Sequence, residues 1–385
     1  AAWKMQNMDF IKVNLPWISE LKPRVSYGVS GNDRIGDYRY LDTYGAMGGF
    51  YNDQDLNTAM LLDNDIYPGV GPIFRFNPRL GWEETKEINM GIDFGLFEGR
   101  LSFTTEYYRR VSDKLLYNMP LPRSTGFHES LVNIASVLNK GIDFSLRSHN
   151  MSRAVKWTTA ITYSFNRNEV LSFPSDQVIQ YSGNKALVLG YPVWGFWGYK
   201  TDGLYETQEE IDNGPTPPAD VAPGDVRYQN TNSLLPEGET DEVINSDDHS
   251  YLGSGLPTSI FSMNNSFRYK SFELTIFIQG IHGKKIYNRT RSWLESMSNL
   301  FNLPARMKDR WPHDKTSGIP RANYQDQNNG QFSDRWIEDG SYVRLKDIVL
   351  GYNLPSRWVN TVNMSEAKVY ISAQNMLTIT NYSGL

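Results

Sequence analysis

The side chains that most often perform catalysis do not assemble into a reactive pattern in this sequence. There is no Cys, so a thiolate nucleophile, a thiolate metal site and a disulfide are all excluded. Adjacent carboxylates, as in Asp247-Asp248 and Glu209-Glu210, point apart on an extended chain, which favours a solvated loop over an acid/base pair. The His residues lie far apart, and none stands in the H-E-x-x-H spacing of a zinc site; they are His128, His149, His249, His282 and His313. We therefore predict no enzymatic activity, no cofactor and no bound metal.

Aromatic side chains are the remaining candidates for ligand binding, and they make up 13% of the chain. Those near the ends of strand-like segments are typical of the interfacial girdles of membrane barrels; examples are Tyr107, Trp157, Tyr352 and Trp358. A second group falls in loop segments: Trp194, Phe196, Trp197, Tyr199 and Trp293. This group predicts a ligand-binding surface that stacks on sugar rings or apolar peptide side chains. The alternative is packing of loop against loop, or against a partner protein.

Composition and charge exclude several classes of protein. The 385 residues have a mean hydropathy of −0.50, and no window approaches the roughly 18 to 20 uninterrupted apolar residues of a membrane helix. A protein whose strands are apolar on one face only stays open, because alternation keeps the average hydropathy low. The net charge is −5 and Lys and Arg form no continuous run, so nucleic acid is not an expected partner.

Strict alternation of apolar and polar residues over about ten positions is the dominant local pattern. In Trp157 to Asn166, the odd positions carry Trp, Thr, Ile, Tyr and Phe, while the even positions carry Thr, Ala, Ser and Asn. One face suits lipid and the other suits water. The pattern recurs in Leu21 to Ser30, Thr85 to Gly95, Leu101 to Tyr108, Ile142 to Arg147, Ile260 to Tyr269, Phe272 to Gln279, Tyr342 to Asn353 and Lys368 to Leu377. With one more strand expected in Trp3 to Val13, the sequence predicts an all-β protein of about ten strands.

The connections between these segments alternate between short and long. The short ones are 94–100, 149–156 and 269–272, and the long ones are 31–84, 168–259 and 281–341. Compact domains rarely hold several loops of this length, but bacterial outer-membrane barrels pair short periplasmic turns with long extracellular loops. We therefore predict a transmembrane antiparallel β-barrel. Lys185 to Tyr205 could add a strand pair within its loop, and Thr207 to Asp212 a turn or two of helix.

The predicted barrel is expected to be incomplete. An unpaired strand edge in lipid leaves backbone amides without partners, so a membrane sheet must close on itself. The chain begins inside a strand-like segment without a secretory signal peptide, and it stops at Leu385 without a terminal strand signature. We expect residues 1–385 to form part of one barrel domain, in a chain cut at both ends.

Six sequence blocks resemble barrel segments of the SusC/RagA-type TonB-dependent outer-membrane transporters, in the same order and with approximately the same spacing. They are Leu21 to Asn32 (L-K-P-R-V-S-Y-G-V-S-G-N), Asn77 to Arg100, Asn139 to Leu146 (N-K-G-I-D-F-S-L), Pro223 to Tyr228 (P-G-D-V-R-Y), Phe332 to Leu354 and Tyr370 to Tyr382. The resemblance covers nearly the whole chain. It implies the carboxy-terminal barrel portion of a 22-stranded transporter, of which about ten strands are present.

The resemblance also implies parts that this chain lacks. Such transporters close the lumen with an amino-terminal plug that carries a TonB box, and we expect the plug, the TonB box and the last strands to be absent. After Tyr382 the family usually continues with Gly and an Asp-Pro-Glu run, where this chain stops. Across Asp225 to Asp248 the family often carries a run that resembles a calcium loop. Here most ligand positions lack carboxylates, so no calcium is expected.

The function implied by the resemblance is active import of a bulky nutrient, an oligosaccharide (glycan) or a peptide, across the bacterial outer membrane with energy passed through TonB. The implied partners are a SusD-like surface lipoprotein, TonB, outer-membrane lipid with lipopolysaccharide, and the substrate. Two alternatives stay open. One is a siderophore or cobalamin receptor of the TonB-dependent type without a SusD-like partner, and the other is a secreted β-sandwich that binds or cleaves glycans.

Overall fold

The computed structural model is built around one large β-sheet. It describes residues 1–33, 44–46, 59–62, 65–68, 70–72, 77–121, 123–125, 129–173, 179–234, 241–296, 302–324 and 326–384. Within these residues, no helix combines the length and the apolar character that crossing a membrane requires. Much of the predicted long loop 31–84 lies outside the described residues.

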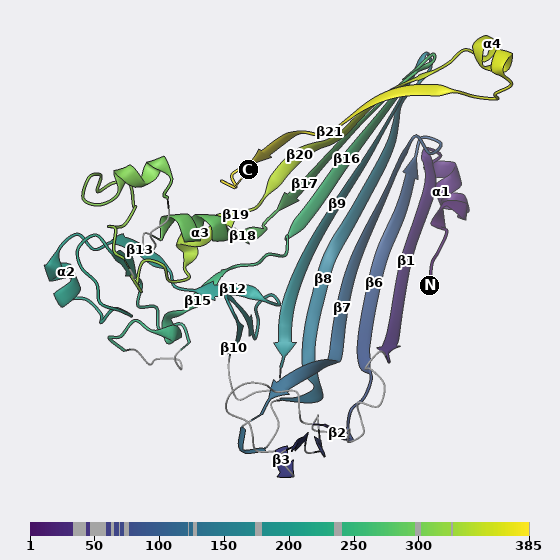
Figure 1. Ribbon diagram of the computed structural model, residues 1–385. Helices are drawn as coiled ribbons and strands as arrows, with labels where there is room; N and C mark the ends of the chain where they lie inside the picture. Colours follow the sequence, from purple (N-terminus) through teal and green to yellow (C-terminus); the bar gives the residue numbers. More distant parts are fainter. Residues whose placement is uncertain are drawn as a thin grey trace.

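Nine long strands form one continuous antiparallel sheet, which we call the wall (Figure 1). In spatial order they are β1 (Ile18–Asn32), β6 (Glu83–Leu96), β7 (Leu101–Pro120), β8 (Glu129–Ser152), β9 (Val155–Ser172), β16 (Ser259–Tyr269), β17 (Phe272–His282), β20 (Tyr342–Asn353) and β21 (Lys368–Thr380). Spatial order follows sequence order, so the wall is an up-and-down meander. Each of the nine segments predicted from alternation lies in one of these strands.

The strand register sorts apolar and polar side chains into separate rows that cross the whole wall. One row of directly paired residues consists of Leu21, Phe94, Phe103, Leu146, Ile161, Met263, Ile278, Leu345 and Leu377. The adjacent row consists of Lys22, Asp93, Thr104, Ser145, Thr162, Ser262, Gln279, Arg344 and Thr378. Because successive side chains of a strand point to opposite faces, the wall has one apolar face and one polar face. A barrel with lipid outside and water inside requires this division.

The two ends of the wall differ in their connections. The short-turn end has the connections 97–100, 153–154, 270–271 and 354–367, the last of which contains α4 (Ser356–Val359) and η7 (Asn360–Val362). The long-loop end carries 33–82, 121–128, 173–258 and 283–341. The connection 121–128 is short because β7, β8 and β9 are 20, 24 and 18 residues long. Roughly 9 to 11 residues cross a bilayer, so these strands are longer than crossing a bilayer requires.

The amino-terminal segment is helical, so the prediction of a strand over Trp3 to Val13 is wrong and the wall has nine strands. The helices are η1 (Met5–Asn7) and α1 (Asp9–Asn14). Only the first residues pair with β1, through an antiparallel bridge between Ala2 and Arg24. The alternation breaks where Phe10 and Ile11, both large and apolar, are adjacent. In α1 Ile11 is buried while Phe10 is exposed.

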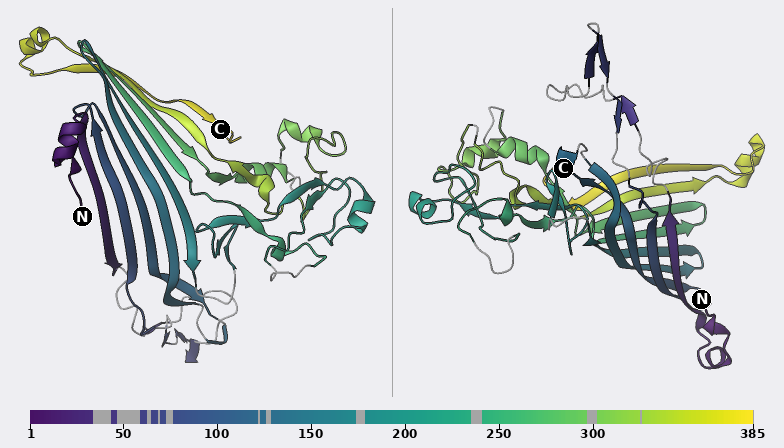
Figure 2. Two further views of the ribbon diagram at one scale, coloured as in Figure 1. Left: turned by 180° about the vertical axis from the view of Figure 1, so that it is seen from behind. Right: turned by 90° about the horizontal axis from the view of Figure 1, so that it is seen from below.

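Two long connections fold together beside the long-loop end into a unit that we call the loop body, made of residues 179–234, 241–258, 283–296, 302–324 and 326–341 (Figures 1 and 2). Its sheets are β10-β11-β12-β15, β13-β14 and β18-β19. Its elements are β10 (Ile179–Ser182), β11 (Lys185–Val188), β12 (Gly195–Gly198), β13 (Thr201–Leu204), α2 (Gln208–Asp212), β14 (Val226–Tyr228), η4 (Ser246–Asp248), β15 (Ser250–Gly253), β18 (Lys285–Tyr287), α3 (Arg289–Glu295), η5 (Ala305–Asp309), η6 (Asp334–Trp336) and β19 (Ile337–Asp339). Lys185 to Tyr205 forms the predicted strand pair within its loop, β11 with β12, and adds no strand to the wall. The helix α2 confirms the short helix predicted over Thr207 to Asp212.

Most of the buried apolar core lies in the loop body rather than in the wall. One cluster gathers Ala186, Val188 and Trp197, and a second gathers Tyr199, Val226, Tyr228 and Ile244. The wall has no comparable core, because one of its faces is apolar and exposed and the other is polar. In the remaining described segments, β2 (Tyr44–Ala46) pairs with β5 (Val70–Pro72), β3 (Ala59–Leu62) pairs with β4 (Asp65–Pro68), and η3 spans Arg123–Thr125.

Candidate functional site

A ladder of ion pairs crosses the polar face of the wall near β1. Lys22 Nζ lies 3.1 Å from Asp93 Oδ2, and Arg24 lies 3.6 Å from Asp93 Oδ1 and 2.9 Å from Glu106 Oε2. Gly91 stands between Arg24 and Glu106 in the register, and a Cβ atom there would lie 3.0 Å from Arg24 Nε. The glycine therefore lets the Arg24 side chain pass over β6 to reach Glu106.

An open groove follows the ladder on the same face, and its lining is polar throughout. Arg110 Nε pairs with Glu87 at 2.9 Å, and Asp143 accepts a hydrogen bond from Ser164 at 2.5 Å. Glu106 stands directly opposite Asp143 in the β7–β8 register, although like charges in that position repel each other. The lining consists of Glu87, Asn89, Glu106, Tyr108, Arg110, Asn139, Asp143 and Asn166. These groups can exchange many hydrogen bonds with a polyhydroxylated or amide-containing ligand.

The β11–β12 hairpin connects the loop body to this groove. Its turn donates the Val193 N–H to Asn168 Oδ1 at 2.8 Å and exchanges two backbone hydrogen bonds of 2.9 Å with Val170. Asn168 donates to Asn139 Oδ1 at 2.9 Å, and Asn139 lines the groove. The loop body is therefore attached to the strand that borders the groove, at its long-loop end.

Three of the five aromatic residues predicted to bind ligand are buried inside the loop body. Trp197 is 4% exposed and Tyr199 is 6% exposed, each within one of the two core clusters. Phe196 is 6% exposed, and its ring centroid lies 6.3 Å from that of Phe332. Protein covers their faces, as the alternative of loop packing requires. A ligand-binding role for these three stays a prediction.

The other two predicted aromatic residues are exposed and lie on separate elements. Trp194 is 38% exposed, in the hairpin turn next to Val193, with φ of +54°. Trp293 is 56% exposed on α3. Trp194 directly follows Val193, whose backbone N–H is hydrogen-bonded to the wall. A ligand-binding role for Trp194 and Trp293 stays a prediction.

Aromatic residues also gather at the short-turn end of the wall. Trp157 stacks on Phe267 with ring centroids 5.3 Å apart, and Phe272 lies 4.8 Å from Tyr352. Trp358, on α4 at the same end, is 54% exposed. These positions suit the interfacial girdle expected from the sequence, which stays a prediction.

A buried salt bridge holds the two connections of the loop body together. Asp225 is 0% exposed and accepts two hydrogen bonds from Arg321, at 2.8 and 2.9 Å. Asn329 donates to Asp225 Oδ1 at 3.0 Å and accepts from the Val226 N–H at 2.7 Å. The hydrogen bond with Asp225 raises the pKa of Arg321. The Asp of the P-G-D-V-R-Y block thus has a structural role.

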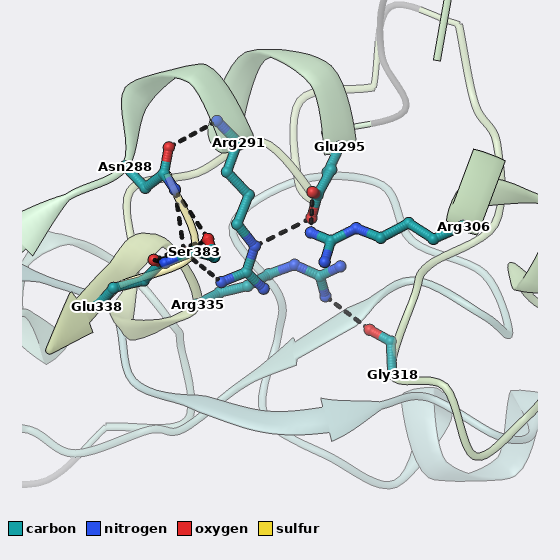
Figure 3. Close-up of polar contacts among 8 residues, drawn as sticks. All are labelled: Asn288, Arg291, Glu295, Arg306, Gly318, Arg335, Glu338 and Ser383. Atoms are coloured by element: carbon teal, nitrogen blue, oxygen red, sulfur yellow. Dashed lines mark hydrogen bonds and ion pairs between the residues drawn. The ribbon is translucent and has the colours of Figure 1, made fainter. Parts of the chain in front are cut away.

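A second polar cluster, which sequence reasoning missed, joins α3 and β19 to the segment after β21 (Figure 3). Glu338 accepts hydrogen bonds from Asn288 at 3.1 Å, from Arg291 at 3.0 Å and from the Ser383 N–H at 2.9 Å. Burial alone would raise the pKa of Glu338, but the bonds from Ser383 and Arg291 lower it. In the sequence, the polar residues of this cluster lie partly in the run S-D-R-W-I-E-D-G at 333–340. That run belongs to a block that resembles the transporter family, but the resemblance gave its polar residues no role.

His249 lies between two tyrosine residues of the loop body. Its ring packs edge-on against Tyr199 with centroids 4.5 Å apart, and its Nδ1 lies 3.0 Å from the hydroxyl oxygen of Tyr181. Burial lowers the pKa of His249 and raises the pKa of Tyr181 to about 12. Both groups are therefore neutral at neutral pH, and their contact contributes to packing.

The described residues contain no group of three or more His, Asp or Glu side chains gathered around a common point that could hold a metal ion. In the stretch considered for calcium, Asp248 is 1% exposed. Its carboxylate accepts from the backbone N–H groups of Thr231, Asn232 and Asn245, at 2.6 to 2.9 Å. The Asp248 carboxylate thus holds together the loop that runs from Thr231 to Asn245. The expected absence of a metal and a cofactor stays a prediction.

The two-faced wall has the β-barrel fold of TonB-dependent transporters. The structure of the RagAB peptide transporter matches 100% of this chain and 40% of its own chain, with a TM-score of 0.80 and 23% identity. The RagAB peptide importer in its 'open-open' state matches 100% of this chain and 39% of its own, with a TM-score of 0.79. The chain therefore forms part of a barrel of this class.

Sequence relatives give the type within this class. TonB-dependent receptor P26 of Formosa agariphila is 33% identical over 98% of this chain, and receptor P3 of the same organism is 30% identical over 100%. TonB-dependent receptor SusC of Bacteroides thetaiotaomicron is 24% identical over 100% of this chain. No protein-family model matches the chain. The chain spans 36 to 37% of these relatives, and its resemblance to SusC-type TonB-dependent receptors is confirmed.

Proposed function

We propose that the full-length protein imports a bulky nutrient across the bacterial outer membrane with energy delivered through TonB. The observation that carries the proposal is the similarity of the whole chain to TonB-dependent receptors, SusC among them. The polar groove on one face of the wall supports it, because it offers hydrogen bonds to a passing ligand. In this proposal residues 1–385 belong to one barrel domain, the long loops face the exterior, and the ligand is moved without chemical change.

A SusD-like surface lipoprotein is the proposed partner at the loop body. SusC-type relatives and the fold shared with the RagAB importer support this partner. TonB would act through a part of the protein outside this chain. Lipid and lipopolysaccharide would contact the apolar face of the wall, where the row through Ile161 and Met263 lies.

The proposed substrate is an oligosaccharide or a peptide. The peptide is supported by the similarity in fold to the RagAB peptide importer. The oligosaccharide is supported by the hydrogen-bonding groups that line the groove, and the exposed ring of Trp194 would stack on a sugar. No observation favours a siderophore or cobalamin receptor, and the nine strands form one sheet rather than the two of a sandwich.

Uptake in cells tests the import proposal. Labelled oligosaccharide and peptide mixtures would be offered to a strain that carries the intact gene, to its deletion mutant and to a mutant without TonB. Import predicts that one mixture enters the first strain only. Equal entry into all three strains would refute the proposal, and purification of the intact protein without any bound lipoprotein would remove the SusD-like partner.

A further inference from the structure

One part of the loop body is strongly basic in an otherwise acidic chain. Residues 283–310 contain seven Lys or Arg and two Asp or Glu, whereas the net charge of the whole chain is −5. This segment supplies Arg291 and Arg306, and Arg335 joins them from η6. Figure 3 shows the three guanidinium groups gathered beside Glu295 and Glu338.

The two carboxylates of this cluster are committed to two of the three arginines. Arg291 lies 3.0 Å from Glu295 and 3.0 Å from Glu338, and Arg306 pairs with the other oxygen of Glu295. Among the described residues, Arg335 has no carboxylate within 4.0 Å. Three cations therefore share two anions, and the cluster holds one positive charge in excess.

Arg335 is also incompletely hydrogen-bonded. One of its terminal nitrogen atoms donates to the Gly318 carbonyl at 2.9 Å, while its Nε is buried and has no partner. The adjacent Asp334 points elsewhere, because it accepts two hydrogen bonds from Thr201. Burial lowers the pKa of Arg335 to about 10, and the nearby Arg291 and Arg306 oppose its charge as well. The charge of Arg335 is therefore opposed by two neighbouring arginines and compensated by no ion pair among the described residues.

The segment between α3 and η5 adds no acidic residue to this basic part of the sequence. Residues 297–301, which connect α3 to η5, read M-S-N-L-F and contain no acidic residue. The Arg306 side chain is 49% exposed, so a molecule approaching from solvent can reach it. Two adjacent guanidinium groups, one accessible and one without an anionic partner, form the geometry that binds oxyanions through charge-assisted hydrogen bonds.

We propose that Arg306 and Arg335 form a binding site for an oxyanion, a carboxylate or sulfate group carried by the imported substrate. The proposal rests on the import function for the identity of the carrier but not for the binding itself. The site predicts selection for acidic oligosaccharides or peptides.

Titration of the purified full-length protein tests this site, with trigalacturonate, neutral maltotriose and inorganic sulfate as probes. Binding of trigalacturonate is expected, and Arg306→Gln should weaken it about tenfold, the usual effect of losing one charge-assisted hydrogen bond. Arg335→Lys keeps the charge but loses the planar fork, and it should also weaken binding. The matched control is Arg289→Gln, which removes an exposed cation from the same segment and should leave the affinity nearly unchanged.

The outcomes separate this site from its alternatives. Equal weakening by Arg289→Gln and Arg306→Gln would reduce the effect to general electrostatics and overturn the proposal. Binding of sulfate without trigalacturonate would overturn the claim that the substrate carries the anion. If the purified protein binds trigalacturonate but cells show no TonB-dependent uptake, the import function alone would be refuted. If Arg335→Lys fails to fold, Arg306→Gln still decides the matter, since Arg306 is half exposed.

Discussion

Arginine substitutions at two neighbouring residues of β9 test whether the apolar face of the wall contacts lipid. Ile161 belongs to the apolar row, between Leu146 and Met263. Thr162 belongs to the polar row and shares a hydrogen bond of 2.7 Å with Ser262. The two positions lie on one strand at nearly the same depth, so the two variants differ chiefly in the face that receives the charge.

The expected magnitude follows from the position of Ile161, six residues along β9 from Val155 at the short-turn end. At roughly 3.3 Å per residue and a tilt near 40°, Ile161 lies about 15 Å from that end, near the middle of an apolar band about 25 Å tall. Arg at the midplane of a barrel costs about 2 to 4 kcal/mol, which shifts the folding equilibrium constant about 30- to 800-fold. Thr162→Arg should cost below about 1.5 kcal/mol, because it loses one hydrogen bond and keeps the guanidinium in water.

The assay is equilibrium unfolding of the intact protein in phospholipid vesicles with denaturant, followed by tryptophan fluorescence. Ile161→Leu is the matched control, since it keeps an apolar side chain and should change the free energy of unfolding only slightly. Equal destabilisation by the two Arg variants would refute the assignment of the apolar face to lipid. A larger destabilisation by Thr162→Arg would show that lipid contacts the face that carries Thr162.

Three further predictions concern the loop body, each measured on the intact protein. Trp197→Ala should destabilise the loop body by about 3 to 5 kcal/mol because its ring is buried in a core cluster, whereas exposed Trp194→Ala should cost well below about 1 kcal/mol; limited proteolysis compares them. Arg321→Met leaves Asp225 buried without its cation and should cost about 3 to 5 kcal/mol; unchanged amide hydrogen exchange around β14 would contradict this. Burial lowers the pKa of His249, so below about pH 6.5 the unfolded chain binds a proton at His249 more tightly than the folded chain does. The free energy of unfolding is therefore unaffected by His249 above about pH 6.5 and decreases as the pH falls below it. His249→Phe should flatten the acid limb of the unfolding profile, and an identical limb in both proteins would exclude His249 as its source.

Alternation was sufficient to find the nine strands of the wall, because a strand between lipid and water must change polarity at every residue. The same reasoning failed over Trp3 to Val13, which contains the helix α1. A short amphipathic helix also separates its apolar residues by polar ones, and over so few residues this spacing resembles the alternation of a strand. It also found only about a quarter of β8 and roughly half of β7 and β9, since beyond the bilayer neither face must be apolar and the periodicity fades.

The candidate site was less accessible to sequence reasoning than the wall. The alternating aromatic residues around Trp197 indicated a surface, but burial depends on what covers them, and the covering residues include Leu234 and Tyr251 from distant parts of the loop. The Glu338 cluster joins positions 288 and 383. No local pattern records a contact across such a separation.

The sequence by itself determined the strands, the two faces of the wall and the connection lengths that mark its two ends, because period-two polarity is a local property of the chain. Only the tertiary structure decided that two connections fold into one loop body attached to the polar groove, and that Arg335 lies near Arg306 without an ion pair to a carboxylate among the described residues. Those features depend on the balance of charge and burial between segments far apart in the sequence, which is set when the chain folds.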